Sequence, residues 1–279
     1  MTVQANAIRA NPTCENCRGE GLCIEIRGPL AHATQCDCIP DCTTCGGQGR
    51  RLVREDDIPR MVPCSCRLFT HRAELFNQAR IPARHANASF QSFEHSSKEA
   101  TRALGGTMTW CKSFVEGGAS SKGLILHGGV GRGKTHLMIA AIRSLILDHG
   151  VSVRFIEFSH LLADLKKGFD EGRGESKTLG ALGQIDLLAI DELGKGKSTD
   201  WERAVADELI SKRYNSMKPL LATTNYPPAR SSGVRTSNLS DEISLQTLED
   251  RVGERVFSRL MQMCDIQRVE GEDYRAKGQ

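Results

Sequence analysis

The chain has 279 residues, enough for one or two domains, and its 39% hydrophobic and 25% charged residues are ordinary for a globular protein. This composition excludes a wholly disordered or collagen-like chain, and a net charge of +3 allows nucleic acid as a partner without requiring it. The most apolar helical run, residues 137–147, is too short to cross a membrane and contains Arg143. The N-terminus lacks the apolar centre of a secretion signal, so we expect a cytoplasmic protein.

Cysteines are concentrated near the N-terminus, where nine of the eleven precede residue 67. Eight of them form a tandem repeat with a period of 28 residues, and each unit reads CxxC, GxG, a strand-like arm and CxC. Cytosolic thiols stay reduced, so such clusters bind metal more often than they form disulfides. We therefore predict two structural Zn²⁺ ions, each held by four thiolates at tetrahedral angles. The first set is Cys14, Cys17, Cys36 and Cys38, and the second is Cys42, Cys45, Cys64 and Cys66.

Alternatives remain open for this cysteine-rich module, residues 1–67. In one alternative, each zinc ion would take cysteine pairs from both repeats, an interleaved arrangement. In the other, no metal binds and the cysteines are buried or redox-active. A closed four-thiolate site has no open coordination position, so we expect the module to bind a partner rather than to catalyse. Its few aromatic residues favour a protein over single-stranded nucleic acid. The CxxCxGxG halves resemble the cysteine-rich region of DnaJ-type chaperones, although the second pairs here are CxC.

Residues 68–85 are expected to form a basic helical linker. Leu68, Leu75 and Phe76 recur at helical spacing, and Pro82 is expected to end the helix. The basic side chains would either track phosphates or form a solvated face. They are Arg72, Arg80 and Arg84, together with Arg67 directly before the linker. A further helix should carry Trp110 and Phe114 on its apolar side.

A nucleotide-binding motif follows a short apolar strand at residues 124–126. Gly128, four further residues, Gly133, Lys134 and Thr135 form a P-loop, and an amphipathic helix comes directly after it. In such a loop the backbone N–H groups surround the phosphates, the lysine reaches the β- and γ-phosphate oxygens, and the threonine hydroxyl ligates Mg²⁺. We therefore predict ATP and Mg²⁺ as cofactors. The expected nucleotide contacts are Gly128, Gly129, Val130, Gly131, Arg132, Gly133, Lys134, Thr135 and His136.

A second motif ends an apolar strand at residues 185–190. Asp191 and Glu192 form a Walker B pattern, in which the aspartate holds Mg²⁺ and the glutamate polarises the attacking water as general base. Another buried strand is expected at 220–224. Asn225 at its tip would position that water or sense the γ-phosphate.

The remaining pattern alternates strands and helices. A strand at 151–158 precedes a helix with Ser159 as its expected N-cap, and a capping box opens a helix at 199–216. Residues 247–263 are expected to form one helix near the C-terminus. This alternation predicts an α/β fold with a parallel, doubly wound sheet that binds nucleotide at the carboxyl ends of its strands, preceded by the small zinc-binding β-hairpin module.

Four segments taken in order resemble the AAA+ ATPases of the DnaC/DnaI helicase-loader group: GGVGRGKTHL, LLAIDELGKG, RYNSMKPLLATTNY and DRVGERVFSRL. The resemblance covers roughly residues 80–279 and implies an AAA+ ATPase domain at 86–279 that self-associates. It also implies a replicative hexameric DNA helicase and single-stranded DNA as partners. By the same resemblance Asn225 matches sensor 1 and Arg275 matches sensor 2. Arg255 and Arg259 fall in the arginine-finger segment, and Arg259 is the preferred finger, with Arg255 as the second choice.

Two other functions remain open. An IstB-type transposition helper shares the P-loop and Walker B motifs but binds duplex DNA and a transposase, and the segment GERVFSRL with the closing Asp-Tyr-Arg favours the loader. A DnaJ-like substrate-binding module fused to an ATPase is disfavoured, because the sequence lacks the HPD tripeptide of J-type helices.

Overall fold

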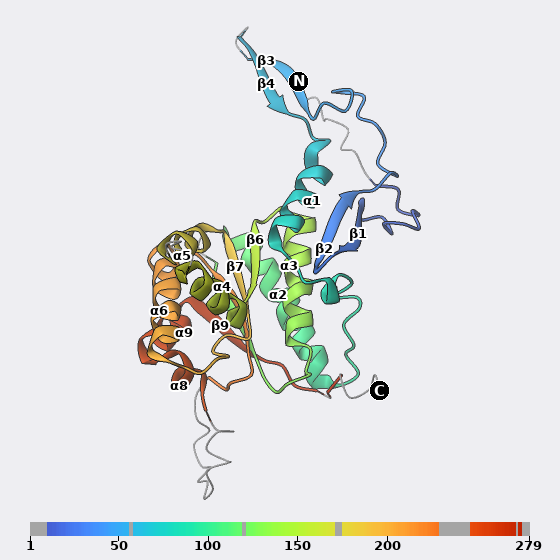
Figure 1. Ribbon diagram of the computed structural model, residues 1–279. Coiled ribbons are helices and arrows are strands. Elements are labelled where there is room, and N and C mark those ends of the chain that lie inside the picture. The colour runs from blue at the N-terminus through green and yellow to red at the C-terminus, as the bar shows by residue number, and fades with distance from the viewer. Residues whose placement is uncertain are drawn as a thin grey trace, which may run out of the picture. The chain divides into compact units, whose positions relative to one another are not determined.

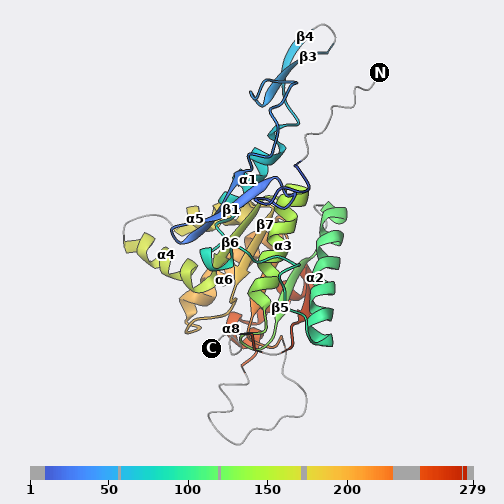
Figure 2. The same cartoon turned by 90° about the vertical axis from the view of Figure 1, so that its right-hand side faces the viewer.

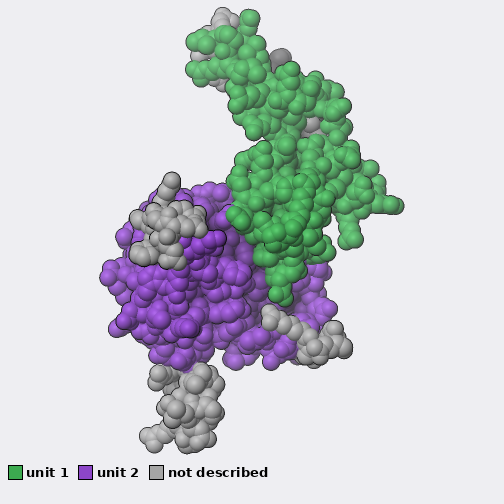
Figure 3. Space-filling model, viewed as in Figure 1, with its two compact units in different colours: residues 1–87, 146–150 green, residues 88–145, 151–279 purple. Residues whose placement is uncertain are grey.

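The computed structural model describes residues 10–55, 58–118, 121–170, 175–228, 246–271 and 273–274. The chain divides into two compact units, residues 1–87 with 146–150 and residues 88–145 with 151–279 (Figure 3). No helix within the described ranges is long and apolar enough to cross a membrane.

The first unit contains two β-hairpins (Figure 1). Strand β1 (Leu22–Arg27) pairs antiparallel with β2 (Leu30–Gln35), and β3 (Arg50–Glu55) pairs in the same way with β4 (Ile58–Pro63). The register repeats with the sequence, because Leu22 lies opposite Gln35 and Arg50 lies opposite Pro63. Each hairpin therefore forms the arm that the repeat predicts between a CxxC pair and a CxC pair.

Helix α1 (Arg67–Ala79) packs on β2 of the first hairpin. It buries Phe69 and Phe76, whereas Leu68, expected on the apolar side, is 44% exposed. The helix ends at Arg80, whose left-handed φ of 58° stops it before Pro82, the expected end. Glycine is required at position 21, because its φ is +75° and a Cβ there would lie 2.3 Å from the Phe69 ring. A short 3₁₀ helix, η1 (Ala83–His85), follows.

The second unit is built on a five-stranded parallel sheet in the order β6-β7-β8-β5-β9. The strands are β5 (Gly123–His127), β6 (Val153–Glu157), β7 (Leu187–Asp191), β8 (Leu220–Thr224) and β9 (Cys264–Arg268). The first four occupy the positions expected from the sequence, and β9 was not expected. Strands β7 and β8 are buried along their whole length, as central strands of a parallel sheet should be.

Helices cover both faces of this sheet, as Figures 1 and 2 show. Helices α2 (Lys98–Gly117) and α3 (Lys134–His149) lie on one side. On the other side, α4 (Phe158–Asp170), α5 (Glu175–Gln184) and α6 (Asp200–Asn215) pack on β7 and β8 in one apolar cluster. The expected capping box of α6 is present at Thr199, and Trp110 and Phe114 are buried on α2. The predicted doubly wound α/β architecture is confirmed.

Two expected helix boundaries were wrong. Helix α4 already begins at Phe158, so Ser159 is not its N-cap; the Ser159 hydroxyl instead donates to Glu157 Oε1 at 2.6 Å. The single helix expected at 247–263 is broken at Gly253, where a φ of +89° separates α8 (Leu248–Val252) from α9 (Glu254–Met263). The apolar periodicity continues through this glycine, and for that reason the pattern did not show the break.

Candidate nucleotide site and metal centres

The P-loop joins the end of β5 to the start of α3, at the carboxyl edge of the sheet. Lys134 is the first residue of α3 and is only 7% exposed. Its ammonium donates to the carbonyl oxygens of Gly128 at 2.9 Å and Gly129 at 2.7 Å. The lysine charge is therefore held inside the loop, beside the helix N-terminus, where phosphate oxygens would meet both.

Gly128 shows why the loop needs glycine. Its φ is +151°, and a Cβ at this position would lie 2.2 Å from the carbonyl oxygen of Val269. The segment after β9 thus runs directly against the loop, and the Tyr274 N–H donates to Gly131 O at 3.1 Å. Residues from the C-terminal end of the described chain therefore help to shape the nucleotide loop.

Asp191 ends β7 beside the P-loop and is held by two hydroxyl groups. Thr135 Oγ1 donates to its Oδ1 at 3.0 Å, and Thr223 Oγ1 donates to the same oxygen at 2.5 Å. Burial raises the pKa of Asp191, and the two hydroxyls partly offset this effect. A carboxylate and a hydroxyl in contact provide the hard oxygen ligands that Mg²⁺ requires, so these side chains fit the predicted ion.

Glu192 follows with a left-handed φ of 55°, which is uncommon for a residue other than glycine. Its backbone N–H donates to Thr223 Oγ1 at 2.9 Å, and its carboxylate forms an ion pair with Lys195. The same ammonium lies 3.6 Å from Oε1 of Glu157, at the end of β6. The hydrogen bond with Glu192 raises the pKa of Lys195. Thr223, Lys195 and Glu157 were missed from sequence, although all three adjoin the carboxyl edge.

The segment before α2 contacts the P-loop side of α3. His136 Nε2 lies 2.9 Å from Ser89 O, and its ring meets Phe93 edge-on with centroids 5.5 Å apart. Phe93 in turn lies against Gly133, where a Cβ would come within 2.7 Å of its ring. The expected nucleotide contact His136 is therefore engaged with residues 89–93, which extend the wall of the loop.

The other expected site residues lie farther along the chain. Asn225 directly follows β8 and has an exposed side chain. Arg259 on α9 is 19% exposed and donates to Asp207 Oδ1 at 2.7 Å, whereas Arg255 is 72% exposed and lies 3.7 Å from the same carboxylate. Both arginines thus contact α6 of their own chain. Arg275 lies outside the described residues.

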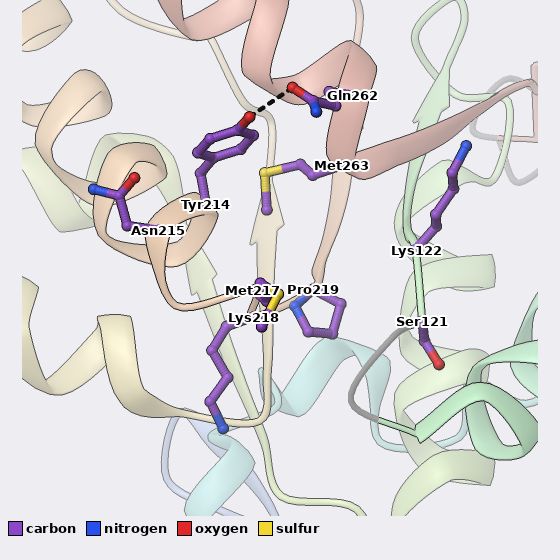
Figure 4. Close-up of a pocket in the computed structure, with 9 residues that line it drawn as sticks. All are labelled: Ser121, Lys122, Tyr214, Asn215, Met217, Lys218, Pro219, Gln262 and Met263. Atoms are coloured by element: carbon purple, nitrogen blue, oxygen red, sulfur yellow. Dashed lines mark hydrogen bonds between the residues drawn. The ribbon is translucent and has the colours of Figure 1, made fainter.

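A separate pocket of about 610 Å³ opens at the opposite edge of the sheet (Figure 4). Its lining includes Lys122, Pro219 and Met263, which immediately precede β5, β8 and β9. Because parallel strands start at one edge and end at the other, this pocket is not the nucleotide site. The remaining lining residues are Ser121, Tyr214, Asn215, Met217, Lys218 and Gln262.

Two groups of four thiols form in the first unit, and each group comes from one repeat. Within each group all the sulfur atoms lie within 4.8 Å of one another. The distances are 3.7 Å for Cys14–Cys36, 3.4 Å for Cys17–Cys38, 3.6 Å for Cys42–Cys64 and 3.3 Å for Cys45–Cys66. A tetrahedral site with Zn–S bonds of ~2.3 Å has sulfur atoms about 3.8 Å apart, whereas a disulfide brings them to about 2.05 Å.

The donor chemistry of both groups also fits zinc. All the thiols are free, and the grouping follows the within-repeat arrangement rather than the interleaved one. A backbone hydrogen bond at Cys38 lowers the pKa of Cys36 to about 7. Burial opposes ionisation of Cys42, but hydrogen bonds to the backbone at Cys45 and Thr44 prevail and lower its pKa to about 6. One thiol in each group shifts the other way: burial raises the pKa of Cys66 to about 12, and at Cys38 a backbone hydrogen bond at Asn11 is outweighed by burial and the neighbouring thiols, which raise its pKa to about 12. Four soft sulfur ligands at this spacing are typical of a structural zinc site.

A P-loop between a strand and a helix, a buried Walker B aspartate beside it, and a parallel sheet in this order define an AAA+ type P-loop ATPase. The chain belongs to the family of IstB-like ATP binding proteins, whose family model matches residues 66–279. It is an ATPase of the group that includes the DnaC-type helicase loaders.

Comparison with individual proteins agrees with this assignment. The replicative helicase loader DnaC of Escherichia coli K12 is 28% identical over 186 residues, 66% of this chain and 67% of that protein. The phage-like element PBSX protein XkdC of Bacillus subtilis 168 is 29% identical over 234 residues, 80% of this chain and 79% of that protein. The crystal structure of the DnaC helicase loader covers 67% of this chain and 99% of its own, with a TM-score of 0.54 and 28% identity. The structure of DnaI covers 69% of this chain and 93% of its own, with a TM-score of 0.50 and 21% identity, and shares the fold.

Proposed function

We propose that this protein is an ATP-dependent loader that binds a replicative hexameric DNA helicase and single-stranded DNA during replication initiation or restart. The observation that carries the proposal is the similarity to the loader DnaC, which spans nearly all of the solved DnaC structure. The proposal is also supported by the contact between the P-loop and the Walker B motif, in which the Thr135 hydroxyl donates to the Asp191 carboxylate.

In this proposal the residues of the nucleotide site have distinct tasks. The Lys134 ammonium and the loop N–H groups bind the phosphates of ATP. Thr135 and Asp191 hold Mg²⁺, which would neutralise charge on the transferring phosphoryl group. Glu192 orients the attacking water and accepts its proton, and this requires its carboxylate to leave Lys195. Asn225 and Arg275 contact the nucleotide from the strand tip and the C-terminal segment.

The cysteine-rich module, residues 1–67, is assigned two zinc ions and the task of protein binding. Residues 68–85 connect it to the ATPase domain, residues 86–279. Basic residues on β6 and α4, among them Arg154 and Lys167, would bind single-stranded DNA. Lys166 lies 5.0 Å above the Trp201 ring. We assign Arg173 to the same set of DNA-binding residues, and it lies outside the described residues.

The nucleotide assignment is tested with two variants. Lys134→Ala should abolish tight ATP binding, because it removes the charge inside the loop. Glu192→Gln should bind ATP as wild type does and hydrolyse it at least about a hundredfold more slowly, because only water activation is lost. Equal ATP affinity of the Lys134→Ala variant and wild type would reject the P-loop role, and unchanged turnover of Glu192→Gln would reject the base.

The loader function is tested by binding of the host replicative helicase with ATP and with ADP, and by competition between single-stranded and duplex DNA. We expect helicase binding and a preference for single strands that weakens with salt. Duplex DNA bound equally well at physiological salt, together with binding of a transposase instead of the helicase, would establish the transposition helper instead.

A further inference from the structure

The two zinc-module repeats use their hairpins differently. In the first repeat, Ala31 and Ala33 are 2% exposed or less, because α1 packs on β2, and Leu22 of β1 is also only 2% exposed. In the second repeat, Leu52 is 62% exposed and Met61 is 55% exposed. Leu52 and Met61 lie directly opposite each other in the register, and they occupy the positions of Ile24 and Ala33 in the first repeat.

Arginines flank the exposed pair. Side chains alternate between the faces of a strand, so Arg50 and Arg54 lie on the same face as Leu52, and both are exposed. The equivalent residues of the first repeat are Leu22 and Ile26. The second hairpin thus presents an apolar pair between two positive charges, whereas the first hairpin packs Ala31 and Ala33 of the equivalent face under α1 and leaves Ile26, at the end of that face, exposed.

The edge of the second hairpin is unsuited to strand addition. In the first repeat the Ala31 N–H donates outward to Ile81 O at 2.9 Å, and the Ala33 N–H donates to Asn77 Oδ1 at 2.7 Å. At the positions equivalent to Ala31 and Gln35, the second repeat has Pro59 and Pro63, which have no N–H. A partner would therefore contact the side-chain face of this hairpin rather than extend its sheet.

We propose that the face formed by Arg50, Leu52, Arg54 and Met61, here called the second-hairpin face, docks an acidic amphipathic helix of a partner protein. The first repeat shows within the same chain that such a hairpin seats a helix. The arginines select the occupant: Asp or Glu side chains beside an apolar stripe would pair with them, whereas α1, which carries Arg67 and Arg72, would be repelled. The proposal rests on the proposed function, in which the partner is the helicase.

The experiment measures the affinity of the full-length, zinc-loaded protein for the purified host helicase with ATP. Leu52→Asp and Met61→Asp should each weaken binding about tenfold or more, because each places a negative charge in the apolar centre. The double variant Arg50→Glu with Arg54→Glu should weaken helicase binding at least as much, and the affinity of this variant should depend less on salt than that of wild type. Zinc content and ATPase activity should remain those of wild type.

Matched controls come from the same module. Ile58→Asp changes a residue that is 57% exposed on the opposite face of the second hairpin, and Ile26→Asp changes one that is 63% exposed in the first hairpin. Both should bind the helicase within about twofold of wild type, as substitutions outside an interface do. An equal loss in the Ile58→Asp variant would overturn the assignment to one face.

The remaining outcomes separate this proposal from the proposed function. If wild type and the Leu52→Asp variant bind the helicase equally well, the loader function stands and the second-hairpin face is rejected. If the variants keep helicase affinity but lose single-stranded DNA, the face binds nucleic acid and the proposal is overturned. If wild type does not bind the helicase at all, both proposals fail.

Discussion

The two units of the chain are each stabilised internally by a different kind of interaction. In the ATPase unit, α4, α5, α6, α8 and α9 enclose one large apolar cluster against the sheet. In hairpin β3–β4, by contrast, every described side chain is at least partly exposed. The first hairpin lies between these extremes, because α1 covers its β2 strand. The second repeat therefore has too little buried apolar surface to fold by itself, so its stability must come from metal bound by its four thiols.

Loss of metal should therefore have the largest effect on the chain. Zinc binding in small structural sites contributes about 10–16 kcal/mol, more than the contacts of one exposed hairpin. Cys42→Ser should remove one of two zinc ions and leave hairpin β3–β4 unprotected, while ATPase activity of the second unit persists. Cys14→Ser should leave hairpin β1–β2 partly protected, because its contact with α1 remains. Elemental analysis and amide hydrogen exchange measure both effects.

Cys23→Ser provides the matched control, since Cys23 lies in β1 outside both thiol groups. This variant should keep both ions. A folded wild-type chain that holds one zinc ion, or a Cys42→Ser variant that retains two, would contradict the assignment of one ion to each repeat.

The next largest effect is expected on the rate of ATP hydrolysis, which in this proposal requires a neighbouring ATPase subunit. An arginine supplied by a neighbouring subunit can accelerate phosphoryl transfer by ~10³–10⁵. The resemblance favours Arg259, yet that side chain is held by Asp207, by Ser211 and by the Tyr214 ring. Arg255 is 72% exposed on the same helix, and its contact with Asp207, at 3.7 Å, is longer than that of Arg259 at 2.7 Å. We therefore expect Arg255 to act as the finger and Arg259 to fix α9 on α6.

Mixing experiments distinguish these two roles. A finger variant still offers its P-loop, and Lys134→Ala still offers its finger, so a mixture of Arg255→Ala and Lys134→Ala should regain hydrolysis that neither shows alone. Arg259→Ala should instead lower the thermal stability of the second unit. Full activity of the Arg255→Ala variant at a concentration where subunits associate would exclude Arg255 as the finger, and rescue of Arg259→Ala by mixing would restore Arg259 to that role.

A smaller effect, on stability alone, is expected at Arg213. This side chain is fully buried and donates to the carbonyls of Leu182, Ile185, Asp186 and Pro219, which closes the end of α5 onto the start of β8. Burial lowers its pKa to about 10, so it remains charged at neutral pH. Arg213→Met leaves these carbonyls without a donor and should cost about 3–5 kcal/mol in urea unfolding of the second unit.

The neighbouring Lys212 serves as the control for Arg213. It pairs with Glu208 on the surface of α6, so Lys212→Ala should change the free energy of unfolding by less than about 0.5 kcal/mol. Zinc content should be unchanged in both variants. A loss of less than about 1 kcal/mol in the Arg213→Met variant would show that the carbonyls find other partners.

Local patterns predicted much of this molecule, and long-range contacts explain what they missed. The P-loop, the Walker B acids and the cysteine repeat are short segments whose spacing fixes their chemistry, and the structure places Lys134, Thr135 and Asp191 together. The break at Gly253 was missed because apolar periodicity runs through it. Arg213 was missed because three of its four acceptors lie at residues 182–186, about thirty residues before it, and no local pattern reveals that contact.

The smallest expected effect concerns Lys195, a surface residue of the ATPase unit that contacts the assigned base. Its ammonium pairs with Glu192 and reaches Glu157, so it holds the carboxylate that must contact water. Lys195→Ala should raise the basal rate of ATP hydrolysis by a few-fold, less than about tenfold, because an exposed pair holds its partner only weakly. In the Glu192→Gln background the same change should have no effect on the rate.

The pH dependence sharpens this test. A lysine whose pKa is raised in the folded protein keeps its ion pair at every pH below its ordinary pKa. The ion pair is lost only as the pH rises through the raised pKa. The ratio of the Lys195→Ala rate to the wild-type rate should therefore stay constant from about pH 6 to 9, well below the lysine pKa. If the Lys195→Ala variant hydrolyses ATP more slowly than wild type, Lys195 holds the Glu192 carboxylate in position to activate water instead of restraining it. A ratio that changes across this range would point to a different titrating group at the carboxyl edge of the sheet.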